Sequence, residues 1–145
     1  MTTIAYRNGV IAADTGLSTG PLLDSHIEKI AKHRDGSVAG ASGEAWWITA
    51  FLQWFKNGGE MPVMPGKDYS FGIVINKRRA VTLYESAEGF NRSFQTKAAY
   101  HAIGSGRQVA IGAMFAGAHP VDAVKAAIAH NDSTFGRVQS YKVGW

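Results

Sequence analysis

The start of the chain carries the residues with the clearest potential for chemistry. Met1 is followed by Thr2, and a small residue at this position allows an aminopeptidase to remove the methionine. Thr2 would then carry a free α-amine beside its hydroxyl, and such an amine has an ordinary pKa of about 8, so part of it is neutral near physiological pH. One residue would thus supply a nucleophile and its general base. Threonine is also common after Met and suits a strand, so this feature alone is weak.

Three further residues are candidate partners for Thr2. If the first turn centres on Asn8, Thr2 and Asp14 are equally far from the centre, and opposed residues share one face of a ladder. Lys29 lies on the opposite side from the neighbouring isoleucines, where its charge would favour an ionised Thr2 hydroxyl; a solvated strand face is the alternative. Gly40 lies just before a helix, where its N–H could face a developing oxyanion, or the residue could simply allow close packing.

These residues need strands and helices to bring them together. Asn-Gly between short apolar runs predicts a first hairpin, and Pro120 suits the first turn of a helix. Ser42 is a plausible N-cap for the first helix, on which Trp46 faces away from the apolar stripe. Grouped strands and grouped helices favour an α+β fold in a single domain, residues 1–145. The expected strands are 3–6, 10–13, 26–32, 37–41, 69–75, 80–84, 98–103 and 138–143, the expected helices are 44–57, 107–116 and 120–130, and 86–96 is ambiguous.

Composition excludes several classes of protein. The chain has 145 residues, 46% of them hydrophobic, and no Cys, which rules out disulfides, thiolate metal sites and a cysteine nucleophile. No apolar run is long enough to span a membrane and no secretion signal opens the chain, so a cytoplasmic location is expected. Lys77–Arg79 is the one basic run and reads as a hairpin tip, which argues against a nucleic-acid partner. The five His show no metal-ligand spacing, and no cofactor is expected.

Four sequence motifs, in order along nearly the whole chain, resemble those of proteasome β-subunits and the bacterial HslV peptidase. They are the opening Thr-Thr-Ile-Ala-Tyr-Arg-Asn-Gly-Val-Ile-Ala-Ala-Asp, the pair Lys29-Ile30, the segment Ala-Gly-Ala-Ser-Gly-Glu-Ala before the first helix, and Ala-Ile-Gly-Ser-Gly before the second. The resemblance implies an N-terminal nucleophile (Ntn) hydrolase with a minimal four-layer α-β-β-α sandwich. It also implies stacked homo-oligomeric rings that cleave peptides or unfolded proteins, with an ATPase unfoldase as a candidate partner.

The same resemblance assigns roles to individual residues. It implies that Thr2 is the nucleophile, that Asp14 and Lys29 are its charged partners, and that Gly40 donates to the oxyanion. Ser105 and Asp132 would orient the Thr2 amine, and the implied substrate-binding residues are Ser18, Val38, Gly40 and Ser42.

Some positions depart from the family pattern and keep other functions open. The first hairpin and the whole chain are short, and Phe135 stands where the family often has a second Ser. The expected function is therefore a threonine endopeptidase, with two alternatives: a catalytically weak structural component of a ring, or an amidase acting on small molecules. Low charge, many small residues and the outward Trp46 favour a homo-oligomer for any of these.

Overall fold

A tight hairpin opens the chain and sets the register of the site. The structure is a computed structural model and describes residues 2–17, 25–131 and 134–145. Strands β1 (Thr3–Arg7) and β2 (Val10–Asp14) are joined by Asn8 and Gly9, whose φ angles of 49° and 78° are both positive, as a two-residue hairpin turn requires. Arg7 therefore pairs with Val10, and the ladder continues toward Asp14 opposite Thr3. The expected pairing of Thr2 with Asp14 is wrong by one residue, because the turn has two central residues and not three.

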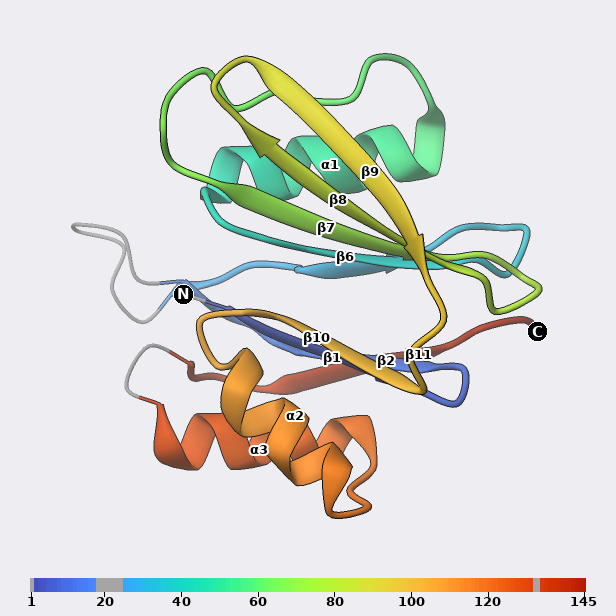
Figure 1. The fold of residues 1–145 in the computed structure, drawn as a ribbon, viewed down its shortest axis with the longest axis vertical. Helices are drawn as coiled ribbons and strands as arrows, with labels where there is room; N and C mark the ends of the chain where they lie inside the picture. The colour runs from blue at the N-terminus through green and yellow to red at the C-terminus, as the bar shows by residue number, and fades with distance from the viewer. Residues whose placement is uncertain (1, 18–24, 132–133) are drawn as a thin grey trace.

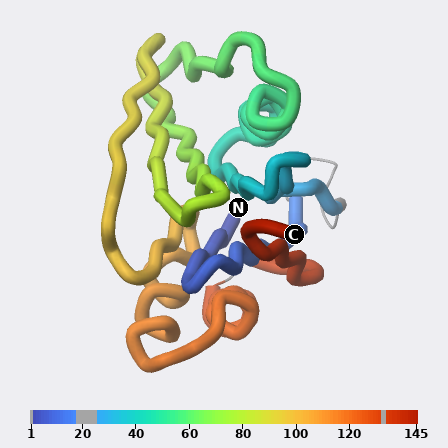
Figure 2. The backbone as a smooth tube through the Cα atoms, turned by 90° about the vertical axis from the view of Figure 1, so that its right-hand side faces the viewer, coloured from blue at the N-terminus to red at the C-terminus, as the bar shows by residue number. Residues whose placement is uncertain are grey.

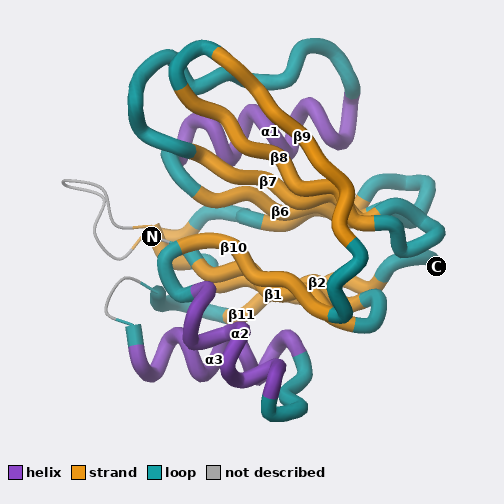
Figure 3. The backbone as a smooth tube through the Cα atoms, in the orientation of Figure 1, coloured by secondary structure: helices purple, strands orange, loops and turns teal. Residues whose placement is uncertain are grey.

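Two main antiparallel sheets face one another (Figures 1 and 3). The first has the order β10 (Tyr100–Gly104), β1, β2, β11 (Val138–Lys142). The second has the order β5 (Ile30–Lys32), β6 (Val38–Ser42), β7 (Ser70–Ile75), β8 (Val81–Ala87), β9 (Phe90–Thr96). Strands β3 (Gly16–Leu17) and β4 (Ser25–His26) form a small ribbon beside them. The described helices are α1 (Ala45–Asn57), α2 (Arg107–Phe115) and α3 (Pro120–His130).

Three apolar clusters hold these elements together. Alternation along each strand sends Ile4 and Tyr6 into the cluster between the two sheets, while Ala5 points to the opposite side. Helix α1 covers the five-stranded sheet through the buried Trp47 and Phe51, and α2 and α3 cover the four-stranded sheet, as the side view in Figure 2 shows. The contacts of α2 and α3 are rich in alanine, which lets the helices approach the sheet closely. None of the helices in the described residues is long and apolar enough to cross a bilayer.

The five-stranded sheet extends past the edge of its partner. β11 packs against β5, β1 and β2 pack against β6, and the edge strand β10 packs against β6 and β7. β9 therefore projects beyond the four-stranded sheet, whereas Val81 at the start of β8 still belongs to the cluster between the sheets. Phe90 and Phe94 of β9 are accordingly 71% and 53% exposed.

The structure corrects the expected fold class. The described chain is mostly β, with two main antiparallel sheets and three helices, and does not form the expected four-layer α-β-β-α sandwich. Only α1 lies on the five-stranded sheet, so that side lacks a complete helical layer. The physical reason is the segment that follows α1: residues 58–69 contain Pro62, Pro65 and three glycines, and they return to β7 without forming a second helix.

Several local predictions can be compared with the observed elements. The order of helices and strands matches the expected one. The ambiguous segment 86–96 contains the last two residues of β8 and the whole of β9, and Lys77–Arg79 is an exposed hairpin tip. Trp46 is 50% exposed, as expected. Ser42 is wrong as an N-cap: it is the last residue of β6, and Glu44 occupies the cap position. The expected strand 26–32 is interrupted, because residues 27–29 leave the ladder between β4 and β5.

Candidate active site

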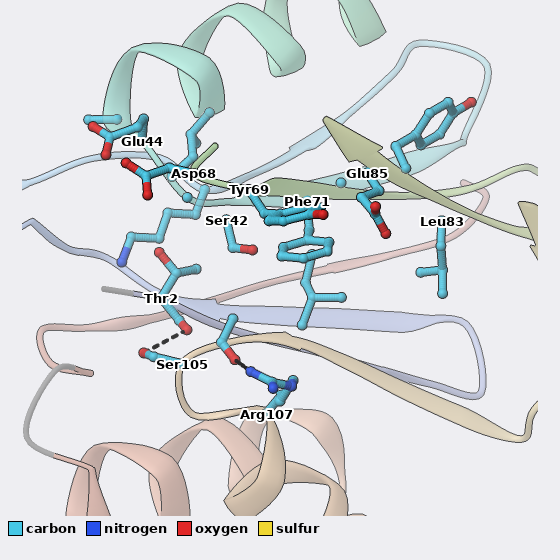
Figure 4. Close-up of a pocket in the computed structure, with 18 of the residues that line it drawn as sticks. Thr2, Ser42, Glu44, Asp68, Tyr69, Phe71, Leu83, Glu85, Ser105 and Arg107 are labelled. Atoms are coloured by element: carbon cyan, nitrogen blue, oxygen red, sulfur yellow. Dashed lines mark hydrogen bonds between the residues drawn. The ribbon is translucent and has the colours of Figure 1, made fainter. Parts of the chain in front are cut away.

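A cavity of about 760 Å³ lies where β1 begins and β10 ends, between the two main sheets. Thr2, Lys29, Ser42 and Ser105 line it, although they come from four separate segments of the chain. Figure 4 shows Thr2 and Ser105 on one wall, with Ser42 and Phe71 across the cavity from them. Its size suits a ligand as large as a short peptide segment.

A buried ion pair between Lys29 and Asp14 lies at the wall of this cavity. Lys29 Nζ donates to Asp14 Oδ2 at 3.0 Å, and the two side chains are only 1% and 0% exposed. The backbone N–H groups of Thr3 and Phe135 also donate to the Asp14 carboxylate, at 2.8 and 3.4 Å. The solvated strand face considered for Lys29 is thus wrong.

Burial also changes the proton affinity of this lysine. Removal from water lowers the pKa of Lys29 below its ordinary value, and the neighbouring Asp14 carboxylate only partly opposes that effect. A lysine paired with Asp14 in this way places a compact positive charge at a fixed position in the wall of the cavity. It is therefore well suited to stabilise negative charge that develops on an atom beside it.

The turn before α2 is built around the backbone of Thr2. Thr2 is 3% exposed, and its carbonyl oxygen accepts hydrogen bonds from Ser105 Oγ at 3.3 Å and from the Gly106 N–H at 3.5 Å. Gly104 has a φ of 99°, and a Cβ there would collide with the Thr2 carbonyl. A side chain at Gly106 would collide with the Thr3 hydroxyl. These two glycines let the turn close over the start of β1 and hold Thr2 in a fixed position.

The residues after α3 add polar contacts that the sequence reading did not foresee. Thr134 Oγ1 shares a hydrogen bond of 2.8 Å with Thr3 Oγ1, and Asn131 Nδ2 donates to the Ser105 carbonyl at 3.3 Å. Their signal in the sequence was weak, namely short polar residues on both sides of Asp132. Asp132 itself, with Ser18 and Met1, lies outside the described residues.

The predicted site residues are not all brought together. Val38 and Gly40 are absent from the lining of the cavity. Val38 is fully buried between the sheets, and Gly40 packs against Ile4 and Ile30, where a Cβ would come within 3.0 to 3.1 Å of their methyl groups. These observations do not test their expected roles as pocket wall and oxyanion donor, which stay predictions.

Ser42, in contrast, does line the cavity and offers an open polar group. The residue is 2% exposed, and its hydroxyl has no hydrogen-bond partner among the described residues. A buried hydroxyl without a partner is costly, so it is a natural contact for a bound polar molecule. No group of His, Asp and Glu in the described residues is arranged to hold a metal ion.

Comparisons with known proteins show similarity in fold. No protein-family model and no curated protein sequence matches the chain. The structure of Thiobacillus denitrificans BPH in complex with epoxomicin has a TM-score of 0.57 and 20% sequence identity, over 99% of both chains. A second structure of Thiobacillus denitrificans BPH has a TM-score of 0.58 and 20% identity, over 99% of this chain and 98% of that chain. A (Gly-1) mutant of Anbu from Hyphomicrobium sp. strain MC1 has a TM-score of 0.62 and 14% identity, over 97% of this chain and 81% of that one.

These comparisons correct the resemblance read from the sequence motifs. The solved structures they name are BPH and Anbu, not proteasome β-subunits or HslV, and identities of 14–20% indicate at most a distant relationship. The chain therefore shares a fold with BPH and Anbu, and that likeness by itself assigns no activity.

Proposed function

We propose that this protein is a threonine hydrolase that cleaves peptide bonds with Thr2 as its nucleophile. One observation carries the proposal: Thr2 lines the same cavity as Lys29, whose buried cation is held by Asp14. Perturbed titratable groups in a cleft are typical of catalytic sites. The closed turn at residues 104–106 adds support, because it fixes the nucleophile from its backbone side and leaves the hydroxyl to the cavity.

The proposed reaction follows from these groups. After loss of Met1, the neutral α-amine of Thr2 takes the hydroxyl proton as Oγ1 forms a bond to the carbonyl carbon of the substrate. The Lys29 cation stabilises the Thr2 oxygen as it loses its proton. The amine then gives the proton to the leaving nitrogen, the C–N bond breaks, and an ester remains on Thr2. Water, deprotonated by the same amine, hydrolyses that ester and regenerates the free hydroxyl.

The proposal is tested by measuring the mass and the activity of one preparation. We expect the intact mass to be that of the chain without Met1, and the same sample to cleave fluorogenic peptides. Because BPH is described in complex with epoxomicin, we expect epoxomicin to inhibit that cleavage. A fraction that retains Met1 has its catalytic amine blocked and serves as the control. Equal turnover by both fractions would show that the α-amine of Thr2 is not the base.

We further propose that the protein works as a homo-oligomer, in the form of a ring. Phe115 is 81% exposed and Ile111 is 40% exposed on one face of α2, and Trp46 is half exposed on α1. The two helices lie on opposite sides of the pair of sheets, and exposed large apolar side chains such as these are typical of subunit interfaces.

Light scattering at micromolar concentration tests the assembly. We expect a mass several times the 15.6 kDa of one chain. Phe115→Ser should lower that mass, whereas Phe90→Ser, which changes a side chain on β9 that is 71% exposed, should not. A monomer mass for the unchanged protein would contradict the proposal, and a dimer would contradict the ring.

A further inference from the structure

An apolar surface on β7, β8 and β9 continues from the cavity of Thr2. Phe71, Leu83 and Phe94 all line that cavity, and we call them the overhang surface. They share one face of the sheet. Leu83 stands directly opposite both Ile73 of β7 and Phe94 of β9, and Phe71 is two residues before Ile73 on β7, so it points to the same face. Because Ile73 belongs to the cluster between the sheets, this is the face that looks toward the four-stranded sheet.

The overhang surface is open because the opposite sheet ends too early to cover it. β10 is the edge strand there and packs against β6 and β7. Phe71 and Phe94 consequently stay 37% and 53% exposed, while Ile103 of β10 forms the facing wall of the cavity. Figure 4 shows Phe71 near the centre of the cavity, between Thr2 and Leu83. A large apolar side chain placed there would therefore lie next to the nucleophile.

We propose that the overhang surface binds a large apolar side chain, aromatic or branched aliphatic, of the peptide cleaved at Thr2. This inference rests on the proposed function and adds the class of substrate. The open Ser42 hydroxyl lies at the same cavity and is the polar contact that a peptide backbone needs next to a buried apolar anchor. The surface and the hydroxyl together make one site, with its apolar part on β7–β9 and its polar part at the end of β6.

The charges around the cavity narrow the substrate class further. Glu44, Asp68 and Glu85 line it, and none of them forms an ion pair with a described residue. Two arginines lie near these carboxylates: Arg107 lines the same cavity, and Arg92 stands opposite Glu85 in the β8–β9 ladder. Neither arginine forms an ion pair with the three carboxylates in the described residues. An acidic side chain in the site would meet like charges, so the site selects against Asp and Glu.

Binding to the Thr2→Ala protein tests this inference independently of catalysis. The probes are N-acetyl-Gly-Gly-Xaa-Gly-Gly-amide peptides in which Xaa is Phe, Leu, Gly or Asp, measured by calorimetry. We expect the Phe and Leu peptides to bind roughly tenfold to a hundredfold more tightly than the Gly peptide, because the free energy gained by burying such a side chain corresponds to that ratio of dissociation constants. The Asp peptide should bind no better than the Gly peptide.

Variants of the surface locate the binding site. Phe71→Ala and Phe94→Ala should each weaken binding of the Phe peptide about tenfold and leave the Gly peptide unchanged. Phe90→Ala is the matched control, because Phe90 lies on the same face of β9 but does not line the cavity. Phe94 is more exposed than Phe71, so its variant keeps the test valid if Phe71→Ala does not fold.

The outcomes separate this inference from the proposed function. Selective binding of the Phe peptide by Thr2→Ala, with no hydrolysis by the unchanged protein, would overturn the proposed function and leave the apolar site standing. Equal binding of the Phe and Gly peptides would overturn the apolar site, even if hydrolysis is observed. A fall in assembly mass with Phe94→Ala, without selective binding, would also overturn it and identify the surface as an interface between copies of this chain.

Discussion

Thr2→Ala is expected to reduce peptide hydrolysis to background, a loss on the order of a millionfold, as for other removed nucleophiles. The variant keeps the backbone contacts of Thr2, because Ser105 and Gly106 bind its carbonyl oxygen and not its side chain. The fold and the assembly should therefore survive. The measurements are turnover of a fluorogenic peptide, melting temperature and mass by light scattering.

Two controls make the Thr2 result specific. Thr2→Ser keeps a hydroxyl and also permits removal of Met1, so partial activity is expected. Thr3→Val changes the neighbouring threonine, whose hydroxyl is bonded to Thr134 and not placed beside the processed amine. That variant should lose stability but keep activity per folded molecule. Turnover of Thr2→Ala equal to that of the unchanged protein would exclude the proposed function.

Lys29→Met is the second change with a large expected effect on catalysis. The substitution keeps the length of the side chain and removes the charge that we propose stabilises the Thr2 oxygen. Loss of one such interaction is worth roughly 3–4 kcal/mol, so the rate per folded molecule should fall on the order of a hundredfold to a thousandfold. Lys29→Arg should also fail, because a guanidinium is too wide for a site this closely packed.

Because Lys29 is buried against Asp14, the Lys29→Met variant is expected to be less stable than the unchanged protein. Sequence reasoning alone predicts that Lys29→Met leaves the melting temperature almost unchanged. Lys29 and Asp14 are nearly inaccessible, however, and breaking a buried pair by removing one partner costs about 3–5 kcal/mol. The double variant Lys29→Met/Asp14→Asn removes both charges and should recover part of that stability without recovering activity. Retention of most activity per folded molecule in Lys29→Met would show that the charge is not used.

The pH profile gives a second readout of Lys29. Activity should rise as the Thr2 α-amine becomes neutral, and fall again as Lys29 loses its proton at its lowered pKa. Between that lowered pKa and the ordinary value, the unfolded chain binds more protons at Lys29 than the folded chain does. Its contribution to the free energy of unfolding therefore increases with pH across this window. Both the falling limb of activity and this increase should disappear in Lys29→Met.

Local sequence determined the elements that local interactions stabilise. Asn8-Gly9 fixed the first turn because both residues accept positive φ, and Pro120 fixed the start of α3 because its ring suits the first helical turn. The apolar stripe of residues 45–57 also predicted which face of α1 is buried. In each case a few neighbouring residues contain the whole physical cause.

Only the tertiary structure decided which residues form the site and what surrounds it. The sequence placed Lys29 near Thr2 but could not show that it is buried against Asp14, since burial depends on the strands and loops packed around it. It did not place the turn at 104–106 on the Thr2 carbonyl, because that contact joins residues about a hundred positions apart. It could not show that the Cβ position of Gly40 faces Ile4 and Ile30, because that contact depends on how β6 packs between its neighbours. Nor did it show that β9 projects past β10, since the relative width of two sheets is set by their packing and not by any one strand.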